Sequence, residues 1–391
     1  MLPFVYYAPT KVVFGKGTEE KVGQLVCEQH CKKVLLHYGG ESAKRSGLLD
    51  RVCTSLRQAG IDFVLLGGVV PNPRLSKVYE GIRLCREENV DFILAVGGGS
   101  VIDSAKAIGY GAPYQGDVWD FYSKKAQAEA CLPIGAVLTI AAAGSEMSDS
   151  SVITNEDGML KRGYNSNLCR CRFAVLNPEL TYTLPAYQTA CGCVDILMHT
   201  MERYFRLEEH TALTDELAEG LMRTVIYSAE ILMSDPTNYD ARAEVMWASS
   251  LSHNGLTGCG AVGDWACHQL EHELSGMFDV AHGAGLAAIW GHWARYVYRE
   301  NPSRFARFAV KVFGIAEGDS PESTALAGIS AMEDFYRRLH MPTNLRELGI
   351  SATDKQLREM AYKASFMGAR TLGAFRTLRQ EDMEKIYFMA R

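Results

Sequence analysis

Residues 91–108 read DFILAVGGGSVIDSAKAI, and this stretch decides the fold class. Its first six residues form an apolar run that predicts a buried strand, and three glycines separate the run from a helical pattern over 101–108. Glycines at such a junction let the backbone approach a pyrophosphate, and the start of the helix offers free N–H groups. The run matches neither the G-x-G-x-x-G fingerprint nor a P-loop, so a plain tight turn remains an alternative.

The same order of strand and helix repeats on both sides of this stretch. Further strands are predicted at residues 10–14, 34–38, 62–66, 132–139, 151–154 and 174–176, and further helices at about 18–30, 44–59 and 75–88. Strands and helices that alternate at this spacing predict a parallel, Rossmann-like sheet with helices on both faces. The glycine clusters follow strand ends, so we expect them to share the sheet edge at which such folds bind ligands.

The character of the sequence changes at Leu184-Pro185. From there to Arg391 the apolar residues recur with a helical period, and β-branched runs are few. We therefore predict an α/β dinucleotide-binding domain over residues 1–184 and an all-α domain over residues 185–391. The second domain would hold a metal ion and the substrate.

The metal prediction comes from one aspartate and several histidines in the second domain. Asp195 and His199 are four residues apart, as are His268 and His272, and His282 follows shortly. Residues four apart on a helix share a face. A carboxylate with neutral imidazoles suits a divalent first-row metal ion. Spacing alone pairs His268 with His272, and for any single histidine a place in the core or on the surface is the alternative explanation.

Composition narrows the class of protein. The chain has 391 residues, 47% of them hydrophobic, and a formal net charge of -6, which is typical of a globular protein with room for two cores. The absence of a basic cluster predicts that neither nucleic acid nor a membrane is a partner. There is no signal-peptide pattern, no apolar run near the ~20 residues of a membrane helix, and an odd number of cysteines. These features predict reduced thiols and a cytoplasmic location.

The end of the second predicted strand bears on the choice of dinucleotide. An acidic residue there would bind the ribose 2′-hydroxyl and repel a 2′-phosphate. The chain has Gly39-Gly40-Glu41-Ser42, followed by Lys44. Ser42 and Lys44 favour NADP(H), whereas Glu41 favours NAD(H) as the alternative.

Taken together, these motifs resemble those of the iron-containing (group III) alcohol dehydrogenases, most of all their NADP-dependent butanol dehydrogenase and aldehyde reductase branch. The resemblance covers nearly the whole chain. The motifs that carry it are Gly97-Gly-Gly-Ser-Val-Ile-Asp103, Ala143-Gly-Ser-Glu146, Thr189-Ala-Cys-Gly-Cys-Val-Asp195-x-x-x-His199, and Asp264-Trp-Ala-Cys-His268-x-x-x-His272-Glu-Leu with the later His282. It implies a dehydroquinate synthase-like fold, in which a dinucleotide-binding α/β domain precedes a helical domain.

The resemblance also implies which residues form the site. The metal ligands would be Asp195, His199, His268 and His282, with Fe²⁺ as the expected ion and Zn²⁺ as the alternative. His272 would not be a ligand but would line the active site as a catalytic candidate, for proton relay or for substrate contact. This ligand set replaces the pairing of His268 with His272 that spacing alone suggests.

The cofactor contacts implied by the resemblance lie in the first domain. They are Gly98, Gly99 and Ser100 at the pyrophosphate, with Ser148 nearby; Gly39, Gly40 and Ser42 at the 2′-phosphate; Asn72 and Thr139 on the adenosine side; and Asp103 and Lys161 at the nicotinamide ribose. The chain departs from the usual family residues at Glu41, Ala143, Ser148 and Asn177. The departure at Glu41 leaves the cofactor preference open.

The implied activity is a metal-dependent interconversion of primary alcohols and aldehydes with NAD(P)H, in the sense of an aldehyde reductase. The partners would be a small-molecule substrate and a second copy of the chain in a homodimer. A glycerol dehydrogenase-like polyol oxidoreductase is one alternative, but it would lack a histidine at the place of His199. A dehydroquinate synthase-like lyase would need a Lys and Arg cluster near the metal, which residues 195–282 do not offer. A non-catalytic metal- or nucleotide-binding protein is a third alternative.

Overall fold

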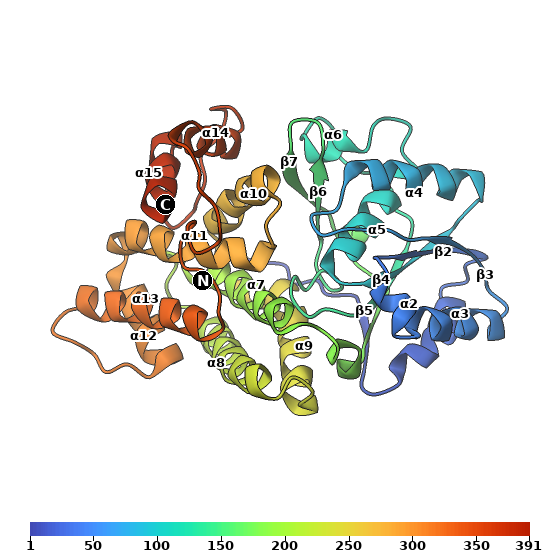
Figure 1. The fold of residues 1–391 in the computed structure, drawn as a ribbon, viewed down its shortest axis with the longest axis horizontal. Helices are drawn as coiled ribbons and strands as arrows, with labels where there is room; N and C mark the ends of the chain where they lie inside the picture. The colour runs from blue at the N-terminus through green and yellow to red at the C-terminus, as the bar shows by residue number, and fades with distance from the viewer. The chain divides into compact units, whose positions relative to one another are not determined.

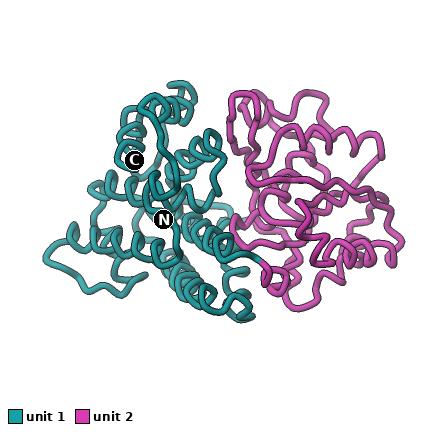
Figure 2. The backbone as a smooth tube through the Cα atoms, viewed as in Figure 1, with its two compact units in different colours: residues 1–6, 184–391 teal, residues 7–183 magenta.

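The computed structural model describes all 391 residues and divides them into two compact units. One, the sheet unit, is residues 7–183, and the other, the helical unit, is residues 1–6 and 184–391 (Figure 2). Along the chain the division falls between Thr183 and Leu184.

The sheet unit is built on six parallel strands in the order β1-β8-β5-β4-β2-β3. The strands are β1 Lys11–Phe14, β2 Lys33–Tyr38, β3 Asp62–Leu66, β4 Phe92–Gly97, β5 Ile134–Leu138 and β8 Phe173–Leu176. At the centre, Leu36 of β2 pairs with Leu94 of β4, and Leu94 pairs with Gly135 of β5. The parallel sheet confirms the predicted fold class for this part of the chain.

Helices cover both faces of the parallel sheet because its central strands are apolar on both sides. They are α1 Val22–Cys27, α2 Ser42–Arg45, α3 Leu48–Gln58, α4 Leu75–Glu87, α5 Gly99–Gly111 and α6 Trp119–Tyr122, with short 3-10 turns at Thr18–Lys21, Asn167–Cys169 and Pro178–Thr181. Alternate strand residues such as Val34 and Leu36 pack against α1 and α3. On the opposite face His37 Nε2 lies 2.9 Å from Ser104 Oγ of α5.

The predicted strand at 151–154 does form, but outside the parallel sheet. It is part of β6 Ser150–Asn155, which pairs antiparallel with β7 Leu160–Asn165 in a separate two-stranded hairpin. The turn residues explain the pairing, since Asn155 Oδ1 accepts the N–H of Asp157 and Gly158 adopts a φ of 77°. A local turn of this kind returns the chain at once, whereas parallel pairing needs a long crossover.

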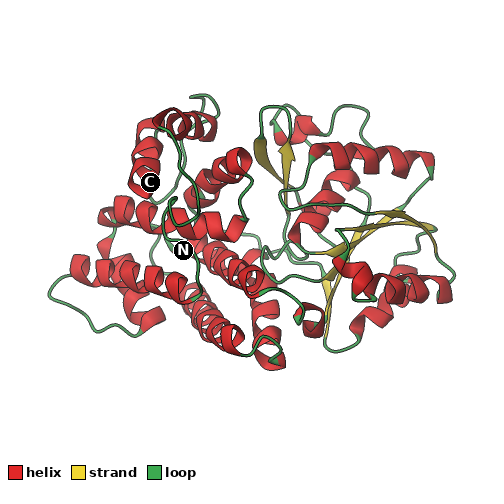
Figure 3. Ribbon diagram, viewed as in Figure 1, coloured by secondary structure: helices red, strands yellow, loops and turns green.

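The helical unit confirms the predicted all-α character of residues 185–391, and Figure 3 shows helices and loops throughout it. Its helices are α7 Ala186–Tyr204, α8 Ala212–Ser234, α9 Tyr239–His253, α10 Ala266–Phe278, α11 His282–Val297, α12 Pro302–Phe313, α13 Pro321–Arg338, α14 Asp354–Ala364 and α15 Gln380–Ala390, with 3-10 turns at Leu256–Gly258 and Tyr298–Glu300. None of the helices is long and apolar enough to span a membrane. Within this unit α11 packs against both α7 and α10 (Figure 1).

Candidate metal centre

Three helices of the helical unit bring the candidate ligands together. α7 carries Asp195 and His199, α10 carries His268, and α11 begins at His282. A Cβ atom at Gly283 would collide with the carbonyl of Cys191 in α7, so only glycine lets the start of α11 lie against the α7 backbone. Because Cys191 is about one turn before Asp195, this contact places His282 beside that carboxylate.

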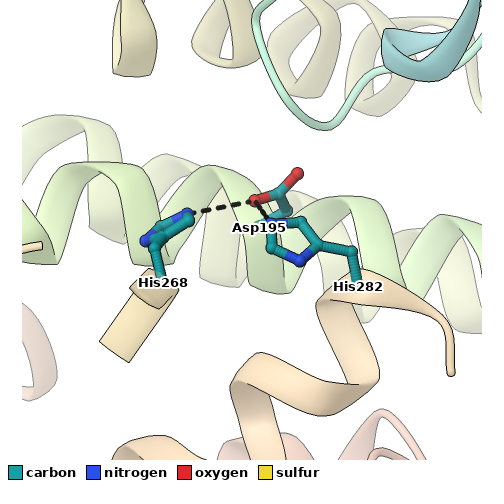
Figure 4. Close-up of side chains that lie close together, drawn as sticks. All are labelled: Asp195, His268 and His282. Carbon is teal, nitrogen blue, oxygen red and sulfur yellow. Dashed lines mark ion pairs between the residues drawn. The ribbon is translucent and has the colours of Figure 1, made fainter. Parts of the chain in front are cut away.

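Asp195 is the centre of the cluster. Its Oδ1 atom lies 3.7 Å from Nε2 of His268 and 3.7 Å from Nε2 of His282 (Figure 4). The ligand atoms of these three residues all lie within 4.8 Å of one another. His199 approaches the same oxygen, with its Nδ1 atom 3.3 Å away, but it is not part of that three-residue group.

The unpaired atoms of the cluster fit a divalent metal ion. Asp195 Oδ1, His199 Nδ1 and His268 Nε2 are buried and have no hydrogen-bond partner. Leaving such atoms unsatisfied costs about 1–3 kcal/mol each, so a fold that gathers three of them around one point needs a compensating partner. One carboxylate oxygen and imidazole nitrogens are the donor set that iron and zinc accept.

The protonation of the imidazoles agrees with this role in part. Burial, together with the neighbouring His253 and His268, holds the pKa of His199 well below its ordinary value. His199 is therefore neutral, as a metal ligand must be. Burial would also lower the pKa of His268, but the carboxylates of Asp195 and Glu202 raise it to about 9. A metal ion would have to displace that proton.

His272 lies beside the cluster centred on Asp195. Its ring centroid is 5.8 Å from that of His282, and its ligand atom groups with those of Glu271 and His282. The residue is 6% exposed, so it is sheltered within the same region of the helical unit. This arrangement differs from the pairing of His268 with His272 that spacing suggests, because His282 reaches Asp195 from a different helix.

Three residues at this site were not anticipated from the sequence. Glu202 contacts His268, Glu271 contacts His282, and the His253 ring lies 4.0 Å from the His199 ring. A helical signal existed for both glutamates, since Glu202 is seven residues after Asp195 and Glu271 is three after His268. No comparable signal existed for His253, which comes from the end of α9.

In the sheet unit, the glycine turn after β4 is a tight junction. α5 begins at Gly99, and a Cβ atom there would lie 2.9 Å from Cβ of Ala143. β2 and β4 are neighbours whose connections leave toward opposite sides of the sheet, which is the switch point at which such sheets bind dinucleotides. Gly39, after β2, lies against the start of α5, since its Cβ position is 3.6 Å from Val101 Cγ2.

Asp103 and Lys161 are close enough for the lysine charge to act on the carboxylate. Burial raises the pKa of Asp103, and the charges of Lys106 and Lys161 oppose that rise. Both carboxylate oxygens of Asp103 already accept protein hydrogen bonds, from Ser145 Oγ at 2.5 Å and from the N–H of Val152 at 3.0 Å.

The other predicted cofactor contacts are placed as follows. The N–H of Thr139 donates to Gly97 O at 3.1 Å, so Thr139 lies at the glycine turn. Ser148 is 1% exposed and its hydroxyl contacts Lys106 Nζ, so it points into the protein. Asn72 is buried and lies in the loop that joins β3 to α4. Gly40 and Ser42 flank Glu41, whose carboxylate accepts from Lys44 Nζ at 3.1 Å.

A parallel sheet with a glycine turn at its switch point and a carboxylate–imidazole cluster are the two parts expected of a metal-dependent dehydrogenase. Residues 9–178 match the family model for iron-containing alcohol dehydrogenase. Residues 189–390 match that for the Fe-containing alcohol dehydrogenase family, C-terminal. The chain belongs to the iron-containing alcohol dehydrogenase family.

Individual relatives resemble it over their full length. It is 43% identical over 387 residues to a probable NADH-dependent butanol dehydrogenase 1 of Bacillus subtilis, with 99% of both chains covered. It is 35% identical over 395 residues to the NADPH-dependent aldehyde reductase YqhD of Escherichia coli, again with 99% of both covered. The crystal structure of NADH-dependent butanol dehydrogenase A from Thermotoga maritima superimposes with a TM-score of 0.96 at 40% identity, over 100% of this chain and 99% of that one.

These comparisons confirm the predicted family, fold and class of reaction. The chain is an oxidoreductase of the type that interconverts alcohols and aldehydes, and this function is favoured over the polyol and lyase alternatives. Family membership also implies a divalent metal ion and a nicotinamide cofactor.

Proposed function

We propose that this protein acts as an aldehyde reductase on short primary aldehydes, and in reverse as a butanol dehydrogenase. The observation that carries the proposal is the convergence of two histidine Nε2 atoms on one buried oxygen of Asp195, each at 3.7 Å. The metal would be held by Asp195, His199, His268 and His282, with Fe²⁺ favoured over Zn²⁺. The butanol dehydrogenases and the aldehyde reductase to which the chain is similar support this substrate class.

When bound, the metal ion supplies a Lewis acid for the substrate oxygen, and the nicotinamide supplies or accepts a hydride. The residues of the chain set the conditions for this chemistry. Asp195 contributes the negative charge that retains a divalent cation, and burial keeps His199 neutral. His272 would give a proton to the substrate oxygen as hydride addition converts the aldehyde to the alcohol, and would take that proton back during oxidation, because it is a second sheltered imidazole close to His282.

We also propose that residues 7–183 bind the dinucleotide at the switch point between β2 and β4. Gly98, Gly99 and Ser100 would hold the pyrophosphate at the start of α5, and Asp103 with Lys161 would hold the nicotinamide ribose. Ser148 would support the pyrophosphate site indirectly, through the contact of its inward-pointing hydroxyl with Lys106.

NADP(H) is proposed as the preferred form of the cofactor. The Glu41 carboxylate is paired with Lys44 at 3.1 Å, which offsets the charge that would repel a 2′-phosphate, and Ser42 lies next to the pair. A homodimer in the cytoplasm is proposed as the working state. All eleven cysteines are free thiols, in keeping with a reducing compartment.

The experiment is a metal and activity measurement on the same protein samples. Wild type, Asp195→Asn and His268→Ala are purified without oxygen, reconstituted with Fe²⁺ or Zn²⁺, and assayed for oxidation of NADPH by butanal. Both variants should lose bound metal and activity together. The control is His210→Ala, since the His210 side chain is 87% exposed. Full turnover by a metal-free Asp195→Asn sample would refute the metal centre, and reaction with glycerol alone would favour the polyol alternative.

A further inference from the structure

We propose that Glu202 and Glu271 are positioning residues, each holding one histidine of the metal centre in the orientation that presents Nε2 to the ion. The inference rests on the metal centre proposed above. It concerns two carboxylates that do not themselves belong to the ligand set.

Glu202 holds His268 at two points. Its Oε1 atom accepts both the ring Nδ1–H and the main-chain N–H of His268, each at 2.9 Å. The Glu202 side chain is 1% exposed, so water does not compete for these contacts. Because an ionised carboxylate only accepts hydrogen bonds, this contact keeps a hydrogen on Nδ1. When a metal ion displaces the other ring proton, the lone pair that becomes available is therefore that of Nε2, on the side of Asp195.

Glu271 holds His282 in the same way from a different helix. Its Oε2 atom accepts from Nδ1 of His282, and its other oxygen accepts from the hydroxyl of Ser275. Glu271 is fully buried. The two pairs thus direct two Nε2 atoms at the same Asp195 oxygen, both at 3.7 Å. Carboxylates behind metal-binding histidines fix the ring and raise its basicity.

The glycine at position 285 is a second observation that bears on Glu271, because the Glu271 side chain occupies the space next to it. A Cβ atom at Gly285 would lie 2.8 Å from Glu271 Oε1 and 2.9 Å from its Cγ. Glycine weakens a helix by about 1 kcal/mol relative to alanine, yet it occupies the first turn of α11 where this side chain needs the space. The first turn of α11 therefore supplies both His282 and, at Gly285, the room that its partner Glu271 occupies.

His199 is supported differently. Its ring packs on the rings of His253 and Trp265, with centroids 4.0 Å and 6.1 Å away, and the carboxylate beside it is Asp195 itself. The centre is thus asymmetric, with two imidazoles backed by carboxylates and one held by ring packing. We expect the two backed histidines to contribute more to metal retention than His199.

The test measures the affinity of the full-length protein for Zn²⁺ alone, by competition with a chelator. Glu202→Gln and Glu271→Gln keep the shape of each side chain and remove its charge, and each should weaken Zn²⁺ binding about 10- to 100-fold. Gly285→Ala should weaken it as well, although every ligand and both glutamates remain. The control is Glu219→Gln, a fully buried carboxylate that contacts Tyr204 and Arg307 instead of a histidine.

Thermal unfolding of the metal-free proteins separates positioning from a general structural role. Variants that unfold earlier than wild type but bind Zn²⁺ as tightly would overturn the inference. Asp195→Asn distinguishes this inference from the proposed metal centre. If Asp195→Asn loses Zn²⁺ but both glutamine variants bind it with wild-type affinity, the metal centre is supported and only this inference is refuted. Equal Zn²⁺ affinity in wild type and Asp195→Asn refutes the centre itself. If Glu202→Gln does not fold, Glu271→Gln and Gly285→Ala decide the outcome.

Discussion

Replacing Lys106 with methionine should loosen residues 145–150 without disturbing the parallel sheet. Lys106 is fully buried in α5, and its Nζ atom donates to the carbonyls of Ser145, Ser148 and Ser150 at 2.7, 3.0 and 2.7 Å. Methionine has a similar length but no donor, so these carbonyls lose their shared partner. The segment matters because the hydroxyl of Ser145 donates to Asp103, a proposed cofactor contact.

The size of the effect follows from the burial of those carbonyls. Ser145 and Ser148 are 3% and 1% exposed, so water cannot replace the lysine, whereas Ser150 is half-buried and its carbonyl can turn toward solvent. Two orphaned carbonyls at about 1–3 kcal/mol each give a cost of roughly 2–6 kcal/mol. If the segment opens locally, its amide protection should fall by roughly 30-fold to 10⁴-fold.

Hydrogen–deuterium exchange followed by mass spectrometry measures this directly, through peptides that cover residues 144–152. Peptides from β2 and β4 serve as the internal reference. Lys77→Met is the matched control, because Lys77 is a partly exposed lysine whose ion pair with Glu80 should contribute less than about 1 kcal/mol. Wild-type exchange rates at residues 144–152 in Lys106→Met would refute the reasoning, since they would mean that this segment stays ordered without the lysine.

Two further predictions concern pH and cofactor choice. Burial lowers the pKa of His37 to about 4. As the pH falls, the His37 ring is therefore protonated in the unfolded chain, near pH 6.5, before it is protonated in the folded protein. The free energy of unfolding should then drop by about 2 kcal/mol between pH 7 and pH 5. Urea unfolding should show a drop about 2 kcal/mol smaller in His37→Gln than in wild type, and equal pH dependence of the two proteins would contradict the prediction. Glu41→Gly should raise kcat/KM for NADPH relative to NADH, and a fall in that ratio would argue against the proposed 2′-phosphate site.

The parallel sheet was predictable because its signals are local. Strands β2, β3 and β4 are short, largely apolar runs that lead into glycines, as at Phe92–Gly97. An apolar run of this kind predicts a strand buried on both faces without any information about the strand it pairs with. The hairpin β6–β7 was only half predicted. Its first strand resembles the others in sequence, but its second, Leu160–Asn165, contains lysine, arginine and glycine, which hide the strand pattern.

The metal cluster shows the limit of helical spacing. Spacing relates residues within one helix, so it joins Asp195 to His199 and His268 to His272. It cannot show that His282 reaches Asp195 from α11, because that contact depends on the close approach of two helix backbones at Gly283. The resemblance to a family predicts His282 as a ligand, and the contact at Gly283 gives the physical reason for its position beside Asp195.

Glu202 and Glu271 could not be chosen from the sequence for a different reason. Asp264 and Asp279 also lie three or four positions from a histidine, so spacing does not separate a carboxylate that supports a metal-binding histidine from one that does not. Only the tertiary contacts of each carboxylate separate them. Gly285 shows the same limit, since a Cβ atom there would lie 2.8 Å from Glu271 Oε1, a close approach that spacing cannot reveal. Once the fold is known, the first turn of α11 explains both the position of His282 and the space that its partner Glu271 occupies.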